Sequence, residues 1–132
     1  MAKHYDRCNR RKEVFDKYDG HCAYCGCKLS INNFAVDHID PIFRGYTEKQ
    51  LGWYNRERGK DSMENYNPCC KSCNSSKSTF TIEQWRKEIS MKFDRIKRDC
   101  SSYSMLLRFG FIEEKRDKIT FYFERDNHGR LD

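Results

Sequence analysis

Two pairs of cysteines with identical spacing are the residues best suited to chemistry in this chain. Cys22 and Cys25 form one Cys-x-x-Cys pair, and Cys70 and Cys73 form another. Four thiolates make a complete tetrahedral set for Zn²⁺, and a set without an open position is typical of a structural site. The sequence therefore predicts that zinc ties together two segments that lie far apart along the chain.

The other cysteines leave some freedom in the choice of ligands. Cys27 could compete with Cys25, and Cys69 could compete with Cys70. We prefer the first set because only its members have the two-residue spacing in both halves. The last two cysteines lie on apolar faces of expected helices, and we expect them to be packed free thiols: Cys8 and Cys100.

Between and beside the cysteine pairs lie three polar residues that could form a second, catalytic site. Asp37 and His38 occupy the segment that the zinc site would loop out, and Asn74 directly follows Cys73. Carboxylate and amide oxygens are suitable ligands for one hard divalent cation, with positions left for water and phosphate. His38 could accept a proton from water near neutral pH. Asp40 is a candidate helper near the metal, although a turn at the strand end explains it better.

Short elements must position these residues. Residues 34–39 and 66–69 read as two strands that pair, and residues 71–77 read as a helix that opens at the second knuckle. A helix is expected over residues 7–18 and ends at Asp19-Gly20. The connection 42–64 could hold a short helix, since Thr47 and Gln50 have the spacing of a capping box.

The C-terminal part, residues 81–126, shows no motif of its own. Thr81 and Gln84 form another capping box, which predicts a long helix with an inward-facing apolar stripe and a possible break at Ser101-Ser102. Residues 119–124 are rich in β-branched and aromatic side chains and predict a strand, with residues 111–113 as its partner. Residues 127–132 are expected to fray. The members of the stripe are Ile82, Trp85, Ile89, Phe93, Ile96, Cys100 and Tyr103.

Composition sets the frame for these elements. The chain has 132 residues, of which 35% are charged and 37% hydrophobic, so we expect one domain with a small core that needs a staple. The sequence shows neither a membrane-spanning run nor a signal peptide, which indicates a cytoplasmic protein with reduced thiols. The net charge is +6, and the excess lies in residues 1–18 and 86–118, on both sides of the cysteine region. Such flanks suit a polyanion, although ordinary solubilising charge explains them equally well.

The combined pattern resembles the HNH endonucleases, a family with a ββα-metal fold. The residues that carry it run from Cys22-x-x-Cys25 through Asp37-His38-Ile39-x-Pro41 and Asn65 to Cys70-x-x-Cys73-Asn74-x-x-Lys77. The resemblance covers about residues 20–80. It implies an α+β fold: a small ββα-metal core stapled by a four-cysteine zinc site, with flanking helices and a C-terminal strand or hairpin. It also implies that His38 is the general base, that Asp37 and Asn74 hold catalytic Mg²⁺ or Mn²⁺, and that Asn65 braces the loop and orients His38.

The activity implied is metal-dependent hydrolysis of phosphodiester bonds in DNA, most simply duplex DNA held by backbone contacts. Candidate substrate contacts are Lys77 and the basic residues of the connection, Arg44, Arg56, Arg58 and Lys60. Two alternatives stay open: a zinc-stabilised nucleic-acid-binding module without catalysis, and a nuclease that acts on RNA. Small proteins of this kind occur in phages and mobile elements. No membrane partner is expected, and the sequence indicates neither a target site nor an oligomeric state.

Overall fold

The computed structural model describes the backbone of residues 2–125 and the side chains from residue 9 to residue 125. The chain forms two compact units: residues 1–82 with 120–132, here called the sheet unit, and residues 83–119, here called the helical unit. Each is described by itself. The single domain expected from chain length stays a prediction. The Cys8 side chain and residues 127–132 lie outside the described residues.

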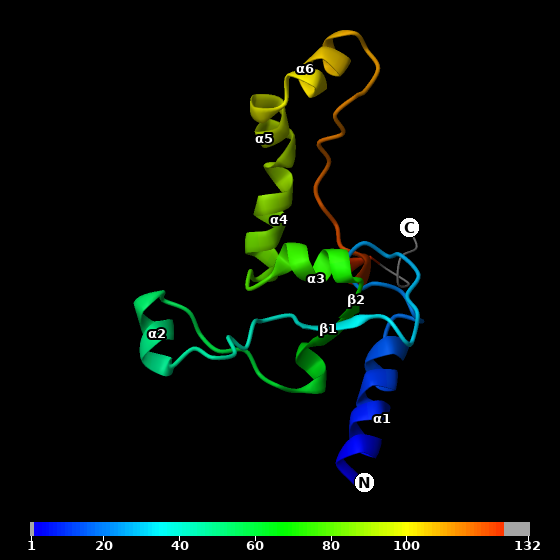
Figure 1. The fold of residues 1–132 in the computed structure, drawn as a ribbon, viewed down its shortest axis with the longest axis vertical. Coiled ribbons are helices and arrows are strands. Elements are labelled where there is room, and N and C mark those ends of the chain that lie inside the picture. Colours follow the sequence, from blue (N-terminus) through cyan, green and yellow to red (C-terminus); the bar gives the residue numbers. More distant parts are fainter. Residues whose placement is uncertain (1, 126–132) are drawn as a thin grey trace. The chain divides into compact units, whose positions relative to one another are not determined.

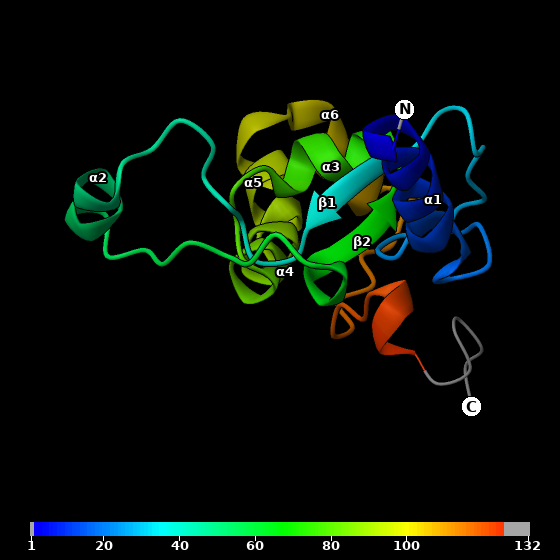
Figure 2. The ribbon, with the colours of Figure 1, turned by 90° about the horizontal axis from the view of Figure 1, so that it is seen from below.

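The sheet unit is built on two short antiparallel strands, β1 (Ala35–His38) and β2 (Tyr66–Cys69). Their register places Asp37 opposite Asn67 and His38 opposite Tyr66. The helix α3 (Lys71–Lys77) begins directly after β2 and lies against β1 (Figure 2). The two strands and the helix predicted for the core are confirmed, and together they form the expected ββα arrangement.

The N-terminal helix α1 runs from Ala2 to Asp16 and therefore starts earlier than the predicted residue 7. Its Val14 is buried and its Phe15 ring lies 5.4 Å from the ring of Phe34. The helix ends through a left-handed turn, with φ of 52° at Asp19 and 77° at Gly20. The Gly20 N–H donates to the carbonyl of Phe15, so this glycine supplies the stop that the sequence indicated.

The connection between β1 and β2 carries the helix α2 (Glu48–Trp53) and the short 3-10 helix η1 (Met63–Asn65). Figure 1 draws α2 at the far end of this excursion. The predicted capping box is present: the Gln50 N–H donates to Thr47 Oγ1 at 3.1 Å, and the Thr47 N–H donates to Gln50 Oε1 at 2.8 Å. Residues 42–60 are called the arm below.

The helical unit corrects the prediction of one long helix. It contains α4 (Ile82–Ser90, whose first residue belongs to the sheet unit), α5 (Lys92–Asp99) and α6 (Ser101–Arg108). The breaks fall at Met91 and Cys100, not at Ser101-Ser102, and Cys100 is extended with φ of −131° and ψ of 104°. Trp85 of the expected apolar stripe is buried, whereas Ile96 is 43% exposed. The stripe is therefore only partly a core.

The predicted C-terminal strand and hairpin are wrong. Residues 111–121 are irregular, and residues Tyr122–Glu124 form the 3-10 helix η2. The N–H groups of Tyr122 and Phe123 donate to the carbonyls of Tyr24 and Ala23, and Phe121 is buried. The aromatic residues thus cover the first cysteine turn instead of pairing as a strand. No helix in the described part of the chain is both long and apolar enough to cross a membrane.

Candidate active site and metal centre

The four cysteines chosen from their spacing meet in the sheet unit. Cys22 and Cys25 lie in the turn after α1, Cys70 caps the N-terminus of α3, and Cys73 lies in its first turn. Their four Sγ atoms all lie within 4.8 Å of one another, and those of Cys25 and Cys70 are 3.9 Å apart. Tetrahedral Zn–S bonds of ~2.3 Å place sulfurs about 3.8 Å apart. The cluster therefore has dimensions that suit a four-coordinate metal.

The short distances between the sulfurs and their burial shift the pKa values of the thiols. A hydrogen bond from Cys73 lowers the pKa of Cys22 to about 4, and the same bond together with burial raises the pKa of Cys73. Burial raises the pKa of Cys69, which is fully enclosed in β2, and raises the pKa of Cys27 to about 12. Neither Cys69 nor Cys27 belongs to the group of described residues that could hold a metal.

A tight turn brings the first pair together. The Gly26 N–H donates to the Cys22 carbonyl at 3.0 Å, and Gly26 has φ of 80°. A Cβ at Gly26 would lie 2.7 Å from the ring of Tyr122. The left-handed backbone and the close aromatic ring both require glycine here.

Asp37 lies at the end of the sheet and forms a buried ion pair with Lys77 of α3. The Lys77 Nζ lies 3.1 Å from Asp37 Oδ2 and donates to the His38 carbonyl at 3.0 Å. The Tyr24 hydroxyl also donates to Asp37 Oδ2. Burial raises the pKa of Asp37, while Lys77 and Tyr24 oppose this shift by favouring the ionised carboxylate. The expected substrate contact at Lys77 is not what the structure shows, because this side chain is fully enclosed.

His38 is held by two neighbours that the sequence did not single out. Its Nε2 lies 2.9 Å from Asp61 Oδ1, and its ring meets the Tyr66 ring edge-on at 5.1 Å. The Tyr66 hydroxyl donates to the same Asp61 oxygen at 2.5 Å. These bonds lower the pKa of Asp61. No sequence signal marks Asp61, because it lies in an irregular segment without a motif.

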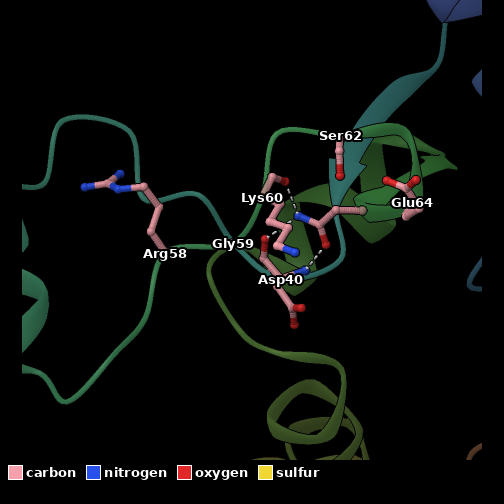
Figure 3. A pocket seen from close by; sticks show the side chains of 7 residues that line it. Asp40, Arg58, Gly59, Lys60, Ser62 and Glu64 are labelled. Atoms are coloured by element: carbon pink, nitrogen blue, oxygen red, sulfur yellow. Dashed lines mark hydrogen bonds between the residues drawn. The ribbon is translucent and has the colours of Figure 1, made fainter.

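Asn65 ties the segment after β1 to the end of the arm. Its Nδ2 donates to the carbonyls of Asp40 at 2.9 Å and Lys60 at 2.7 Å, and its Oδ1 accepts from the Asp40 N–H at 2.8 Å (Figure 3). The Ile39 N–H donates to the Asn65 carbonyl at 2.9 Å. Asn65 therefore joins the two loops, while the orientation of His38 that the resemblance implies for it stays a prediction.

The braced loops border a hollow of about 530 Å³. Figure 3 shows the Lys60 and Asp40 side chains at its wall and Arg58 farther along the chain. Gly59 permits the close approach of the two loops, since a Cβ there would lie 2.0 Å from the Asp40 carbonyl oxygen. The hollow is lined by charges of both signs: Asp40, Arg58, Gly59, Lys60, Ser62, Glu64 and Asn65.

The remaining predicted residues separate into three groups. Asn74 is half-buried on α3, three residues before Lys77 and so near the same helix face. Arg56 donates to the Thr79 carbonyl at 2.8 Å, and Arg58 donates to several carbonyls of the arm, so both brace the chain itself. Arg44 and Lys60 are exposed.

A strand pair followed by a helix, with cysteine turns before the first strand and at the helix start, defines a ββα-metal protein. A family model described as "HNH endonuclease" matches residues 22–80, and this segment is therefore similar to the HNH endonuclease family.

The known proteins that are similar to this chain include a prophage-derived protein and a Cas9 enzyme. The SPbeta prophage-derived candidate HNH endonuclease YoqL of Bacillus subtilis (strain 168) is 33% identical over 81 residues, which cover 59% of this chain and 32% of YoqL. This chain thus spans about a third of the length of that relative. A crystal structure of the Type II-C Cas9 enzyme from Actinomyces naeslundii matches with a TM-score of 0.48 and 23% identity, over 63% of this chain and 7% of Cas9.

Proposed function

We propose that this protein is a metal-dependent endonuclease that hydrolyses phosphodiester bonds in DNA, with His38 as general base. The observation that carries the proposal is the fixed imidazole of His38, which is 15% exposed, is bonded to Asp61 and directly follows the buried Asp37. A nucleic-acid-binding module without catalysis would need the cysteines and the basic side chains. It would not need a histidine held in this way next to a buried carboxylate.

Asp61 acts in this proposal as a positioning residue. An ionised carboxylate only accepts hydrogen bonds, so the contact at 2.9 Å places the imidazole proton on Nε2. The lone pair of the neutral ring is then on Nδ1, which is the atom that accepts a proton from the attacking water. Tyr66 holds Asp61 through its hydroxyl group and limits rotation of the ring through its edge.

The ligand atoms at each site indicate which metal it would bind. Four thiolates at these separations suit structural Zn²⁺, which no further residue needs to complete. Asp37 and Asn74 would hold Mg²⁺ or Mn²⁺, which stabilises charge on the phosphate when bound. The buried side-chain oxygen of Asn67, opposite Asp37 in the sheet, lacks a hydrogen-bond partner among the described residues. A carboxylate and an amide thus occupy facing positions of the two strands, and oxygen donors of this kind suit such a cation.

Lys77 sets a condition on this second metal. Its ammonium group already neutralises Asp37 at 3.1 Å. A divalent cation would add two positive charges to a pair that is neutral, so we expect tight binding only when a substrate phosphate supplies negative charge. Lys77 also fixes the His38 carbonyl, and in this way it holds the general base and the proposed ligand in one arrangement.

Plasmid nicking tests the proposal. Purified protein is incubated with supercoiled plasmid and Mg²⁺, Mn²⁺ or EDTA, and its zinc content is checked afterwards. His38→Ala should lower the cleavage rate by roughly 10²–10⁴-fold while zinc content and folding persist. His21→Ala is the matched control, because His21 packs against Tyr122 beside the cysteine turn, outside the proposed site. Cleavage by His38→Ala at the parent rate would show that the base is assigned incorrectly.

The positioning role of Asp61 is tested with a measurement that a purely structural residue would not affect. Asp61→Ala should lower kcat on the order of tenfold with little change in KM, and Asp61→Asn should recover part of the loss because its amide oxygen still accepts from Nε2. The ¹⁵N chemical shifts of His38 should report the Nε2–H tautomer in the parent and a mixture in Asp61→Ala. An unchanged tautomer in the alanine variant would refute the positioning role.

The choice of DNA over RNA rests on the family and is tested in the same way. The proposed base and metal ligands act on the phosphate group, which DNA and RNA share, so the assay includes single-stranded DNA, duplex DNA and RNA of matched sequence. Cleavage of RNA alone would replace the DNA assignment with the RNA alternative. Metal-independent binding without cleavage of any substrate would favour the binding module.

A further inference from the structure

The arm exposes two large aromatic side chains next to each other. Trp53 is 67% exposed and Tyr54 is 66% exposed, and Tyr46 meets the Tyr54 ring edge-on at 6.5 Å. Leu51 on the same helix is buried, so α2 already directs its apolar anchor inward. Aromatic residues normally bury their rings, and neighbouring exposed ones mark an interaction surface.

The charge of the arm suits one kind of partner. Residues 42–60 contain five basic and two acidic side chains, and the Lys49 Nζ lies 5.8 Å from the centre of the Trp53 ring. One acidic group, Glu48, is already paired with Arg58 at 2.9 Å. The free charge beside the rings is therefore positive. A ligand with flat aromatic faces and a regular negative charge matches this surface, and unpaired nucleotides have both.

The arm is tied together along its own length. Arg58 donates to the carbonyls of Phe43 at 2.9 Å and Tyr46 at 2.6 Å, and its guanidinium also contacts the Ile42 carbonyl. Arg56 lies over the Phe43 ring with its Cζ 4.7 Å from the ring centre. These bonds join the outgoing and returning segments. The aromatic rings are thus presented on an ordered element, which reduces the entropy lost on binding.

We propose that the arm is a stacking site for unpaired bases of a nucleic-acid strand, with Trp53 and Tyr54 under the bases and Lys49 near the phosphates. The inference rests on the proposed function in that the ligand is nucleic acid. It goes beyond that function because the site binds bases and cuts nothing. Such a site would favour single-stranded or frayed DNA over an intact duplex.

Tryptophan fluorescence tests the stacking directly. The chain has two tryptophans, Trp53 in the arm and the buried Trp85 in the helical unit. The zinc-loaded protein carries two substitutions, Trp85→Phe and His38→Ala. The first leaves Trp53 as the sole indole. The second, together with the omission of Mg²⁺, prevents cleavage of the strand. Oligothymidylate should quench its emission, and tripolyphosphate, a polyanion without bases, should not. Quenching that is equal for both ligands, or absent while fluorescence anisotropy shows binding, would overturn the proposal.

Substitutions give an independent measurement that does not need Trp85→Phe to fold. Trp53→Ala and Tyr54→Ala should each weaken oligothymidylate binding on the order of tenfold. Neither should change binding of tripolyphosphate. Phe111→Ala is the matched control, because Phe111 is 76% exposed but lies in the helical unit, and it should bind like the parent. Equal losses in the control and the arm variants would overturn the proposal.

The two proposals fail in distinguishable ways. If plasmid is cut normally but Trp53→Ala binds oligothymidylate as the parent does, the arm proposal is wrong and the endonuclease proposal stands. If oligothymidylate quenches Trp53 but no substrate is cut under any metal condition, the arm proposal stands and the endonuclease proposal is wrong. Absence of any binding to oligothymidylate overturns the arm proposal.

Discussion

Replacing Lys77 by methionine tests the electrostatic centre of the site. Methionine keeps most of the apolar stem that fills this fully enclosed position but removes the ammonium group. Asp37, which is only 5% exposed, then keeps the Tyr24 hydroxyl but loses the charge that lies 3.1 Å from its Oδ2. The His38 carbonyl also loses its donor at 3.0 Å. The variant therefore leaves a buried carboxylate without its counter-charge.

The size of the effect follows from these losses. Removing one partner of a buried ion pair costs about 3–5 kcal/mol, because the other charge remains without compensation. This is a large part of the roughly 5–15 kcal/mol that stabilises a typical domain. With a urea dependence near 2 kcal/mol per molar, the unfolding midpoint should fall by roughly 1.5–2.5 M. The unfolding is measured at fixed zinc concentration, since bound metal contributes to folding stability.

The double variant Asp37→Asn with Lys77→Met separates charge from packing. It removes both charges, and the Tyr24 hydroxyl can still donate to the amide oxygen. We expect it to be more stable than Lys77→Met alone, with a residual cost of about 1–3 kcal/mol for the His38 carbonyl left without its donor.

The affinity for Mn²⁺ is a second readout, and it should rise while stability falls. Lys77→Met should bind Mn²⁺ more tightly than the parent in the absence of nucleic acid, because Asp37 is no longer neutralised.

Two results would contradict this reasoning. If Lys77→Met lowered stability by less than about 1 kcal/mol, the ion pair would not be the charge compensation that Asp37 requires. If the single and double variants were equally unstable, the loss would come from packing and not from the carboxylate. Weaker or unchanged Mn²⁺ binding by the single variant would separately remove the competition between Lys77 and a divalent cation.

Three further predictions concern other parts of the sheet unit. Cys25→Ser should abolish stoichiometric zinc binding, as measured by mass spectrometry of metal content, while Cys27→Ser should retain it. Gly59→Ala should lower stability by roughly 1–3 kcal/mol, because its Cβ would meet the Asp40 carbonyl at 2.0 Å. Gly52→Ala, which meets nothing within 4 Å, should not lower it. Finally, hydrogen bonds hold the pKa of Asp61 below its ordinary value of about 4. The ionised Asp61 therefore stabilises the folded state at pH values above about 4, and this contribution is lost as the pH falls through the lowered pKa. Asp61 is 66% exposed, so the loss should stay below about 1 kcal/mol, and Asp61→Asn should remove it.

The cysteine turns and the central strands could be predicted because their signals are local. The repeated spacing of Cys22 with Cys25 and of Cys70 with Cys73 favours one set of four cysteines before any tertiary contact is considered, and the structure brings these four together. Strand β1 begins with the apolar pair Ala35 and Val36, and the helix between Lys71 and Lys77 begins directly after Cys70. These features depend on residues that are neighbours in sequence.

The parts that could not be predicted depend on tertiary partners. Residues 119–124 have strand composition, but the N–H groups of Tyr122 and Phe123 find carbonyls in the first cysteine turn, and this tertiary pairing overrides their propensity. Asp61 acquires its importance only because the returning arm brings it to His38, 23 residues away. Lys77 likewise looks like a free cation in the sequence until α3 is placed against β1.

The placement of α3 links the structural metal to the proposed chemistry. Cys70 and Cys73 tie the start of this helix to the cysteine cluster that could hold a metal, and Asn74 and Lys77 follow them on the same helix. A rotation of the helix would therefore move a proposed metal ligand and the counter-charge of Asp37 together. Loss of zinc should weaken the Asp37–Lys77 pair even though the four sulfurs take no part in hydrolysis. The cysteine cluster would be structural in its coordination, but its position would make the proposed active site depend on it.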